Sequence, residues 1–180
     1  MISPDPCGRG FLFTPTRNNL HLNNSDIILV FMGKMIGYMV TWTTYGTWLQ
    51  GDERGYVRQG KILPLNNIIR TANLKLQKNK TVTLTGEEKE VVRKAILAES
   101  VKINQTIRAL AVCSNHVHLV AQPCNESIEE IVSRYKNIAM FALGKNGRKG
   151  RIWTRSFDKR FCFSEDDLIG KIEYVQKHNQ

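Results

Sequence analysis

The chain has 180 residues, which suits one compact domain, or a domain with a short extension, and excludes a large multidomain protein. Lysine and arginine number 26 against 16 acidic residues, and the net charge of +10 suggests an anionic partner, nucleic acid or a membrane surface, or else a merely soluble basic protein. No apolar run approaches the roughly 20 residues of a membrane span, so neither a signal peptide nor a membrane anchor is predicted.

The first elements are read from composition and residue type. Residues 1–34 are rich in Pro, Asn, Gly and Ser, so we expect a weakly ordered N-terminal extension before a folded domain of residues 35–180. After Ile36, a run of β-branched and aromatic residues predicts a core strand that frays at Gly46. Residues 51–83 read as a basic, polar loop that could include a short helix.

Two capping boxes predict helices that flank a hairpin. Thr85 with Glu88, and Ser127 with Glu130, have the Ser/Thr-x-x-Glu pattern, and apolar residues follow each at helical spacing to about residues 104 and 143. Between them, the apolar runs 107–113 and 116–122 are separated by two residues, as in a pair of antiparallel strands.

The C-terminal part is predicted as short strands or extended loop over 151–163, followed by a helix that begins at Ser164. The order of elements favours an α+β fold, a ferredoxin-like antiparallel sheet with helices packed on it. The four cysteines stand far apart, which argues against a disulfide scaffold and a structural zinc site, and favours a reducing, cytoplasmic location; they are Cys7, Cys113, Cys124 and Cys162.

A metal site is suggested by His116-Val117-His118. Alternate side chains of a strand share a face, so both imidazoles point to one side and could chelate one divalent ion, Mg²⁺ or Mn²⁺. The alternative is a pair of surface or hydrogen-bonded histidines.

The last helix carries a candidate nucleophile. Its apolar stripe is predicted to contain Leu168, Ile169, Ile172 and Val175, which places Tyr174 nearly opposite, with His178 one turn later on the face of Tyr174. A phenol has a pKa of about 10, so its attack on a phosphodiester needs a metal or a base nearby. His178 could be the third metal ligand, or an exposed histidine near a frayed helix end. Tyr135 is the rival tyrosine, but its neighbours predict core packing.

Basic residues alternate with Trp153, Phe157 and Phe161, a pattern that suits single-stranded DNA, although Trp153 and Phe161 could instead belong to the core. The candidate DNA-binding residues are Lys145, Arg148, Lys149, Arg151, Arg155, Lys159 and Arg160.

Four segments resemble the HUH single-strand transposases with one catalytic tyrosine, specifically the REP-associated tyrosine transposases. These segments are MVTWTTYGTWLQGDERG, CSNHVHLVAQ, RIWTRSFDKRF and IEYVQKHN, within residues 36–179. The resemblance implies a DNA transposase and endonuclease, active as a homodimer, that cleaves and rejoins single-stranded or hairpin DNA through a 5′-phosphotyrosine, without a nucleotide cofactor. It assigns the metal to His116 and His118, the nucleophile to Tyr174, and the third ligand to His178.

Two departures from the family leave alternatives open. The Asn-Pro step that many relatives carry after the tyrosine is absent, and the sequence stops at Gln180 where relatives usually continue. One alternative is a domesticated module that binds DNA without cutting it, and another is a metal-dependent phosphodiesterase that uses water. RNA binding is a third, but the expected aromatic submotifs are missing.

Overall fold

The structure is a computed structural model that describes residues 34–53, 55–58 and 61–179. The extension predicted for residues 1–34 therefore lies, apart from Lys34, outside the described residues. Within the described part, no helix is both long and apolar enough to cross a membrane.

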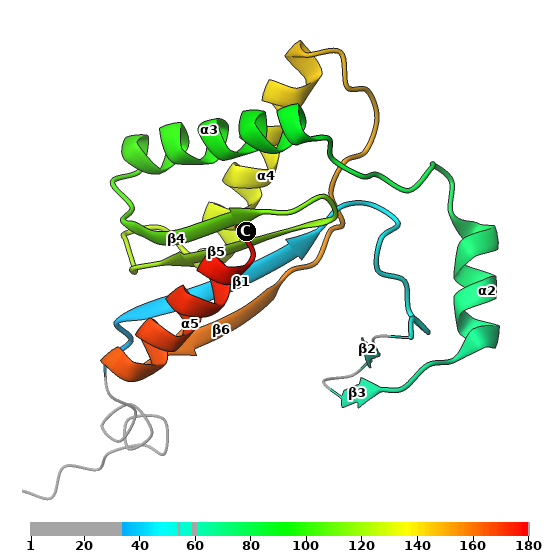
Figure 1. The fold of residues 1–180 in the computed structure, drawn as a ribbon, viewed down its shortest axis with the longest axis horizontal. Helices are drawn as coiled ribbons and strands as arrows, with labels where there is room; N and C mark the ends of the chain where they lie inside the picture. The colour runs from blue at the N-terminus through cyan, green and yellow to red at the C-terminus, as the bar shows by residue number, and fades with distance from the viewer. Residues whose placement is uncertain (1–33, 54, 59–60, 180) are drawn as a thin grey trace, which may run out of the picture. The chain divides into compact units, whose positions relative to one another are not determined.

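A four-stranded antiparallel sheet forms the centre of the fold (Figure 1). Its strands are β1 (Gly37–Thr43), β4 (Ile107–Val112), β5 (His116–Ala121) and β6 (Asp158–Cys162), in the order β4-β5-β1-β6. Every neighbouring pair is antiparallel. With one helix after β1 and another after β5, this is the strand order of a ferredoxin-like sheet, and the predicted α+β class is confirmed.

The two capping boxes open the helices α3 (Gly86–Lys102) and α4 (Ile128–Lys145), and in each helix both reciprocal bonds of the box are present. Both helices pack on one face of the sheet, over a core that includes Val40 and Trp42 of β1. The third sheet-packed helix, α5 (Glu165–Lys177), covers the opposite face, where Met39 belongs to a smaller core (Figure 1).

An inserted segment between β1 and α3 contains the hairpin of β2 (Tyr56–Arg58) and β3 (Lys61–Leu63), then α2 (Asn67–Leu76). The sequence suggested a short helix here but not the hairpin. Gly51 has a φ of +89°, and a Cβ at this position would lie 2.4 Å from the Asn66 carbonyl oxygen. Only glycine therefore lets the loop after β1 approach the start of α2 so closely.

Candidate active site

β5 presents two imidazoles on one face of the sheet. Val117 and Leu119 point into the core under α3 and α4, so the alternation of a strand turns His116 and His118 to the α5 face. The predicted orientation of both histidines on one side is therefore what the strand adopts. His118 is buried and His116 is half-buried.

α5 brings a tyrosine and a third histidine to the same face. Leu168 and Val175 anchor the helix in the smaller core, whereas Ile169, predicted to be buried, is 49% exposed. The buried face of α5 is therefore rotated away from Ile169 and toward the side of the helix that carries His178. Tyr174 accordingly lies on the flank of the helix, next to the sheet, rather than opposite the buried face, and is 46% exposed.

These four side chains form one cluster. The ring centroid of His118 lies 4.5 Å from that of His116, 4.8 Å from that of His178 and 5.4 Å from that of Tyr174. The Tyr174 and His178 rings are 4.6 Å apart. One ligand atom from each of the three histidines can be chosen so that all lie within 4.8 Å of one another.

Hydrogen bonds fix the orientation of each imidazole. Nδ1 of His178 lies 2.8 Å from the carbonyl oxygen of Tyr174, and Nδ1 of His116 lies 2.6 Å from Oδ1 of Asn115. Nδ1 of His118 lies 2.7 Å from Oγ1 of Thr41, the residue opposite it on β1. The carbonyl oxygen of Tyr174 and the amide oxygen of Asn115 accept the Nδ1 protons of His178 and His116, so Nε2 is the nitrogen of these two rings that can ligate a metal. The Thr41 hydroxyl orients the ring of His118.

The protonation of His118 also suits a ligand. Burial, together with the neighbouring imidazoles of His116 and His178, lowers the pKa of His118 from 6.5 to about 4. This ring is therefore neutral at physiological pH, as metal coordination requires. Three convergent imidazoles with oriented Nδ1 atoms fit a divalent cation.

The cluster lines a small open pocket of about 190 Å³. Its walls come from β1, the loop that follows it, the β4–β5 turn, β5 and α5; the residues are Thr41, Thr43, Thr47, Trp48, Asn115, His116, His118, Tyr174 and His178. Typical small-molecule sites measure about 300–1,000 Å³, so this pocket suits a group as small as one phosphodiester.

Sequence reasoning missed five residues of this pocket, which are Thr41, Thr43, Thr47, Trp48 and Asn115. Thr41 and Asn115 orient histidines, and Trp48 forms part of the wall. The position of Asn115 directly before His116 could have indicated that Asn115 orients this histidine. The role of Thr41 could not be predicted in this way, because it depends on the register between β1 and β5.

Tyr135 takes no part in this pocket. It is fully buried, and its hydroxyl donates to Oε1 of Gln105, whose amide nitrogen in turn donates to the hydroxyl of Tyr38. Burial raises the pKa of Tyr135 well above its ordinary value. The predicted core packing of Tyr135 is confirmed.

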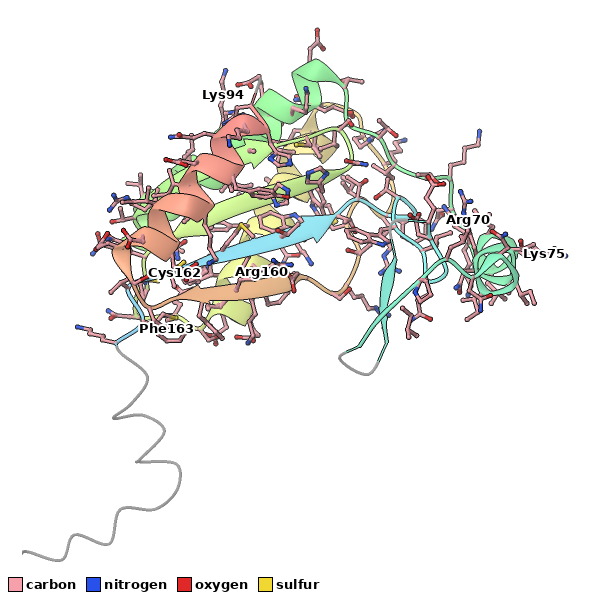
Figure 2. The ribbon with its side chains drawn as sticks, turned by 60° about the horizontal axis from the view of Figure 1, so that its bottom comes forward. Arg70, Lys75, Lys94, Arg160, Cys162 and Phe163 are labelled. Atoms are coloured by element: carbon pink, nitrogen blue, oxygen red, sulfur yellow. The ribbon has the colours of Figure 1, made fainter. Side chains whose placement is uncertain are left out.

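The predicted DNA-binding residues fall into three groups. Arg151 and Arg155 line an open groove of about 420 Å³ between α4 and residues 151–157, here called the α4 groove. Lys145, Arg148 and Lys149 lie at the C-terminal end of α4 or just after it, and Lys159 and Arg160 lie on β6. Figure 2 shows Arg160 on this strand.

Several of these cations already have protein partners. Arg148 bonds to Glu88 and to the carbonyl of Thr83, so it joins the end of α4 to the start of α3. Lys159 pairs with Glu129, and Arg160 pairs with Asp158. Of the interleaved aromatics, Trp153 is buried, but Phe161 is 41% exposed, contrary to a core role.

The α4 groove contains another cation that the sequence did not single out. Lys136 is buried, and its amine donates to the carbonyls of Thr154, Arg155 and Ser156 at 3.0–3.1 Å. Burial, and to a smaller extent the charge of Arg151, lowers the pKa of Lys136 to about 8. These bonds hold the groove wall of residues 154–156 against α4.

Two solved structures are similar to this chain. The first is a REP-associated tyrosine transposase bound to a REP hairpin, with 14% identity, a TM-score of 0.47, and coverage of 78% of this chain and 64% of that chain. The second is a putative transposase from Deinococcus radiodurans R1, with 16% identity, a TM-score of 0.38, and coverage of 80% and 91%. A comparison with curated proteins found no match.

The family assignment comes from the sequence itself. The model of the family described as "Transposase IS200 like" matches residues 74–178, more than half of the chain. The matched range contains β4, β5 and α5, and with them all three histidines and Tyr174. The resemblance to transposases is thereby confirmed at the level of the family: the chain belongs to the IS200-like transposases.

Proposed function

We propose that this transposase cleaves and rejoins single-stranded DNA with Tyr174 as the nucleophile and a divalent cation bound by His116, His118 and His178. The observation that carries the proposal is the convergence of one exposed phenol and three imidazoles on one pocket. The REP-associated branch of the family is part of the proposal, as it rests on the motifs quoted above.

The chemistry is a pair of transesterifications. The phenolic oxygen of Tyr174 attacks the phosphorus, a Tyr–O–P bond forms as the P–O3′ bond breaks, and the phenol loses its proton while the leaving 3′ oxygen gains one. The products are a 5′-phosphotyrosine and a free 3′-OH. Attack by another 3′-OH reverses these steps, so the energy of the phosphodiester is conserved and no nucleotide cofactor is needed.

The phenol, the small pocket and the bound cation have separate parts in this chemistry. Tyr174 is exposed enough to meet a phosphate, and the small pocket admits little more than that group. A divalent cation bound there acts as a Lewis acid on the phosphate and offsets the developing charge. Nitrogen ligands are softer than the oxygens that Mg²⁺ prefers, so of Mg²⁺ and Mn²⁺ the second is favoured.

We propose single-stranded or hairpin DNA as the partner, held by the basic residues predicted above. Arg151 and Arg155 are the foremost contacts, because both are exposed on the α4 groove and the buried cation Lys136 adds to its positive potential. Phosphates would lie along this groove through charge attraction. A homodimer is proposed as the active assembly, and light scattering in solution would test it.

The decisive experiment is a cleavage assay with end-labelled hairpin DNA and Mn²⁺ or Mg²⁺. We expect a covalent protein–DNA adduct that survives denaturing electrophoresis and is lost in Tyr174→Phe. The matched control is Tyr135→Phe, which alters a buried tyrosine and should leave the adduct intact. Clean hydrolysis without an adduct would support the water-using phosphodiesterase instead, and binding without cleavage would support a domesticated DNA-binding module.

The metal ligands have their own test. His116→Ala should abolish cleavage but leave DNA binding largely intact, because the DNA contacts lie mainly outside the pocket. Calorimetric titration with Mn²⁺ should show one site per chain, lost in His118→Ala and weakened in His178→Ala. Unchanged Mn²⁺ binding in these variants would remove the histidines from the metal site.

A further inference from the structure

Two of the four groups in the pocket of the three histidines, here called the histidine pocket, lie at the very end of α5. Tyr174 is in the last turn of this helix, and His178 is its C-cap, directly after the last helical residue Lys177. The last carbonyls of a helix have no partner within the helix, so helix ends tend to fray. A metal ligand and a nucleophile at this place therefore need contacts that hold the turn against the sheet.

Such contacts are present along the edge of the sheet. β4 is an edge strand, and the carbonyl oxygen of its residue Leu110 accepts a hydrogen bond from Nδ2 of Asn179 at 3.1 Å. The thiol of Cys113, which follows β4, donates to the carbonyl oxygen of His178 at 3.8 Å. The end of α5 is therefore bonded both to β4 and to the turn that follows β4.

An arginine from the other face of the sheet completes these contacts. Arg93 lies on α3, which covers the face opposite α5 (Figure 1). Its Nη1 donates to the carbonyl oxygen of Leu110 at 3.0 Å, and its Nη2 donates to Oδ1 of Asn179 at 3.0 Å. Arg93, Asn179 and the Leu110 carbonyl are thus joined pairwise by three hydrogen bonds, and this group is here called the edge clasp.

The edge clasp depends on the shape of a guanidinium. Its planar fork has donors on three nitrogens, so Arg93 can bond to Leu110 and Asn179 while Nε pairs with Glu90 of its own helix at 3.3 Å. A lysine has a single donor atom and cannot copy the two bonds from Nη1 and Nη2. The positive charge of Arg93 also lies at the C-terminal end of α5, where the helix dipole favours a cation.

We propose that Arg93 is a positioning residue of the active site, which keeps the end of α5 wound and held on β4, so that His178 stays at the metal and Tyr174 at the phosphate. This inference rests on the proposed function for the roles of His178 and Tyr174. Arg93 acts through Asn179 and not on the reacting groups. The two residues are 86 positions apart, so no local pattern of the sequence indicates this role.

The affinity for Mn²⁺, measured by calorimetry, tests whether the edge clasp acts on His178. Arg93→Gln should lower the affinity by about 10-fold, because a residue that orients a metal ligand is lost. In a chain that already has His178→Ala, the same substitution should have no further effect, because the ligand that it positions is gone. Arg93→Lys, which keeps the charge but not the fork, should recover only part of the affinity.

The matched control is Glu90→Gln. It removes the ion-pair partner of Arg93 on the exposed side of α3 and leaves the three bonds of the edge clasp in place. The Mn²⁺ affinity should therefore be unchanged in Glu90→Gln. Thermal unfolding of each variant verifies that it is folded.

Amide hydrogen exchange, followed by NMR in chelator, tests the hold on the helix without metal or DNA. Arg93→Gln and Asn179→Ala should each speed the exchange of backbone amides in the last turn of α5, because that turn opens more often. Exchange in the first turn of α5, which Ser164 caps, should not change. A general loss of stability would instead speed exchange in both turns.

The outcomes distinguish this inference from the proposed function. If the last turn of α5 exchanges at the same rate in Arg93→Gln, or if Arg93→Gln lowers the Mn²⁺ affinity equally with and without His178, the positioning role is wrong even when Tyr174 forms its adduct. If exchange in that turn rises but His178→Ala leaves Mn²⁺ binding unchanged, the proposed metal site is wrong and the hold of Arg93 on α5 stands.

Discussion

At the scale of single residues, the pocket depends on hydrogen bonds to atoms that do not bind the metal. The Thr41 hydroxyl lies 2.7 Å from Nδ1 of His118, whereas the Thr43 hydroxyl, on the same face of β1, pairs with the hydroxyl of Thr154. Thr41 therefore orients a histidine and Thr43 does not, although both threonines line the pocket.

This difference gives a matched pair of variants. Thr41→Val keeps the shape of the side chain but removes the hydroxyl that orients His118, so Mn²⁺ affinity measured by calorimetry should fall about 10-fold to 100-fold. Thr43→Val should change the affinity far less. Equal losses in the two variants would contradict the assigned role of Thr41.

His118 also links stability to pH. Its pKa is about 4 in the folded chain and 6.5 as the ordinary value, so between these values the unfolded chain binds more protons. The stabilisation is fully present above pH 6.5, and it is lost as the pH falls toward 4.

The free energy of unfolding of the chelator-treated chain, measured in urea, should therefore fall by on the order of 2–3 kcal/mol through this group between pH 6.5 and pH 4. His118→Gln cannot titrate, so its free energy of unfolding should depend less on pH by that amount. A pH dependence identical to that of the unsubstituted chain would show that His118 is not the group responsible.

The sequence predicted some of these residue positions and not others. The common face of His116 and His118 follows from the period of a strand, which is local information. The pairing of Thr41 with His118 depends on the register between strands 77 residues apart, which no local pattern contains. The flank position of Tyr174 was missed because α5 covers a polar pocket as well as a core, so its apolar stripe does not mark the whole buried face.

At the scale of elements, α5 must lie close to β1. Gly37, the first residue of β1, allows this approach: a Cβ there would lie 2.8 Å from Cδ1 of Leu168 and 3.3 Å from the Ala121 carbonyl oxygen. Leu168 is 1% exposed, so its side chain has little room to move. Gly170, on the exposed side of α5, has no atom within 4 Å of such a Cβ.

Glycine-to-alanine exchanges at the two positions should have opposite effects. Gly37→Ala should destabilise the chain by about 1–3 kcal/mol through overpacking under α5. Gly170→Ala should stabilise it by about 0.4–1 kcal/mol, because alanine suits a helix interior better. Thermal or urea unfolding measures both, and a stabilising Gly37→Ala would contradict the close packing of α5 on β1.

Elements with strong local signals were predicted well. Both capping boxes and the β4–β5 hairpin follow from spacings of two to four residues, and the structure confirms them. The β2–β3 hairpin was missed because strands of three residues have no measurable alternation. The position of β6 at the sheet edge was also not predictable, because strand order is set by long-range packing.

At the scale of the whole molecule, the charge of +10 is useful to DNA binding only where it is exposed and not already paired. Arg151 and Arg155 are exposed on the α4 groove, and Arg151 bonds to a neutral group, the Trp153 carbonyl. Arg148 and Lys159 are instead engaged by carboxylates. Net charge alone therefore could not distinguish the residues that contact phosphates.

Salt dependence of binding tests this distinction. Each phosphate contact removed should lower the slope of log K against log salt by about 0.7 for a single strand, so Arg151→Ala and Arg155→Ala should each show that decrease. The control is Lys94→Ala, an exposed lysine on α3 (Figure 2), which should leave the slope unchanged. Binding that does not depend on salt would rule out a phosphate-holding groove.

The proposed domain division predicts that a chain shortened to residues 35–180 keeps the fold and the chemistry. Ile36 already bonds through its backbone N–H to the Cys162 carbonyl, so the first strand is anchored at its start. The shortened chain should unfold cooperatively and form the same covalent adduct. Loss of the adduct with an intact fold would instead assign a functional part to residues 1–34.

The residues of the histidine pocket are divided between the sheet and the last helix. Two of the imidazoles sit on β5, in the middle of a rigid sheet, while the third imidazole and the phenol sit one turn apart on α5. A helix moves as a rod, so lifting it from the sheet withdraws His178 and Tyr174 together and leaves His116 and His118 in place. The nucleophile and the third metal ligand therefore both depend on how closely α5 packs on the sheet.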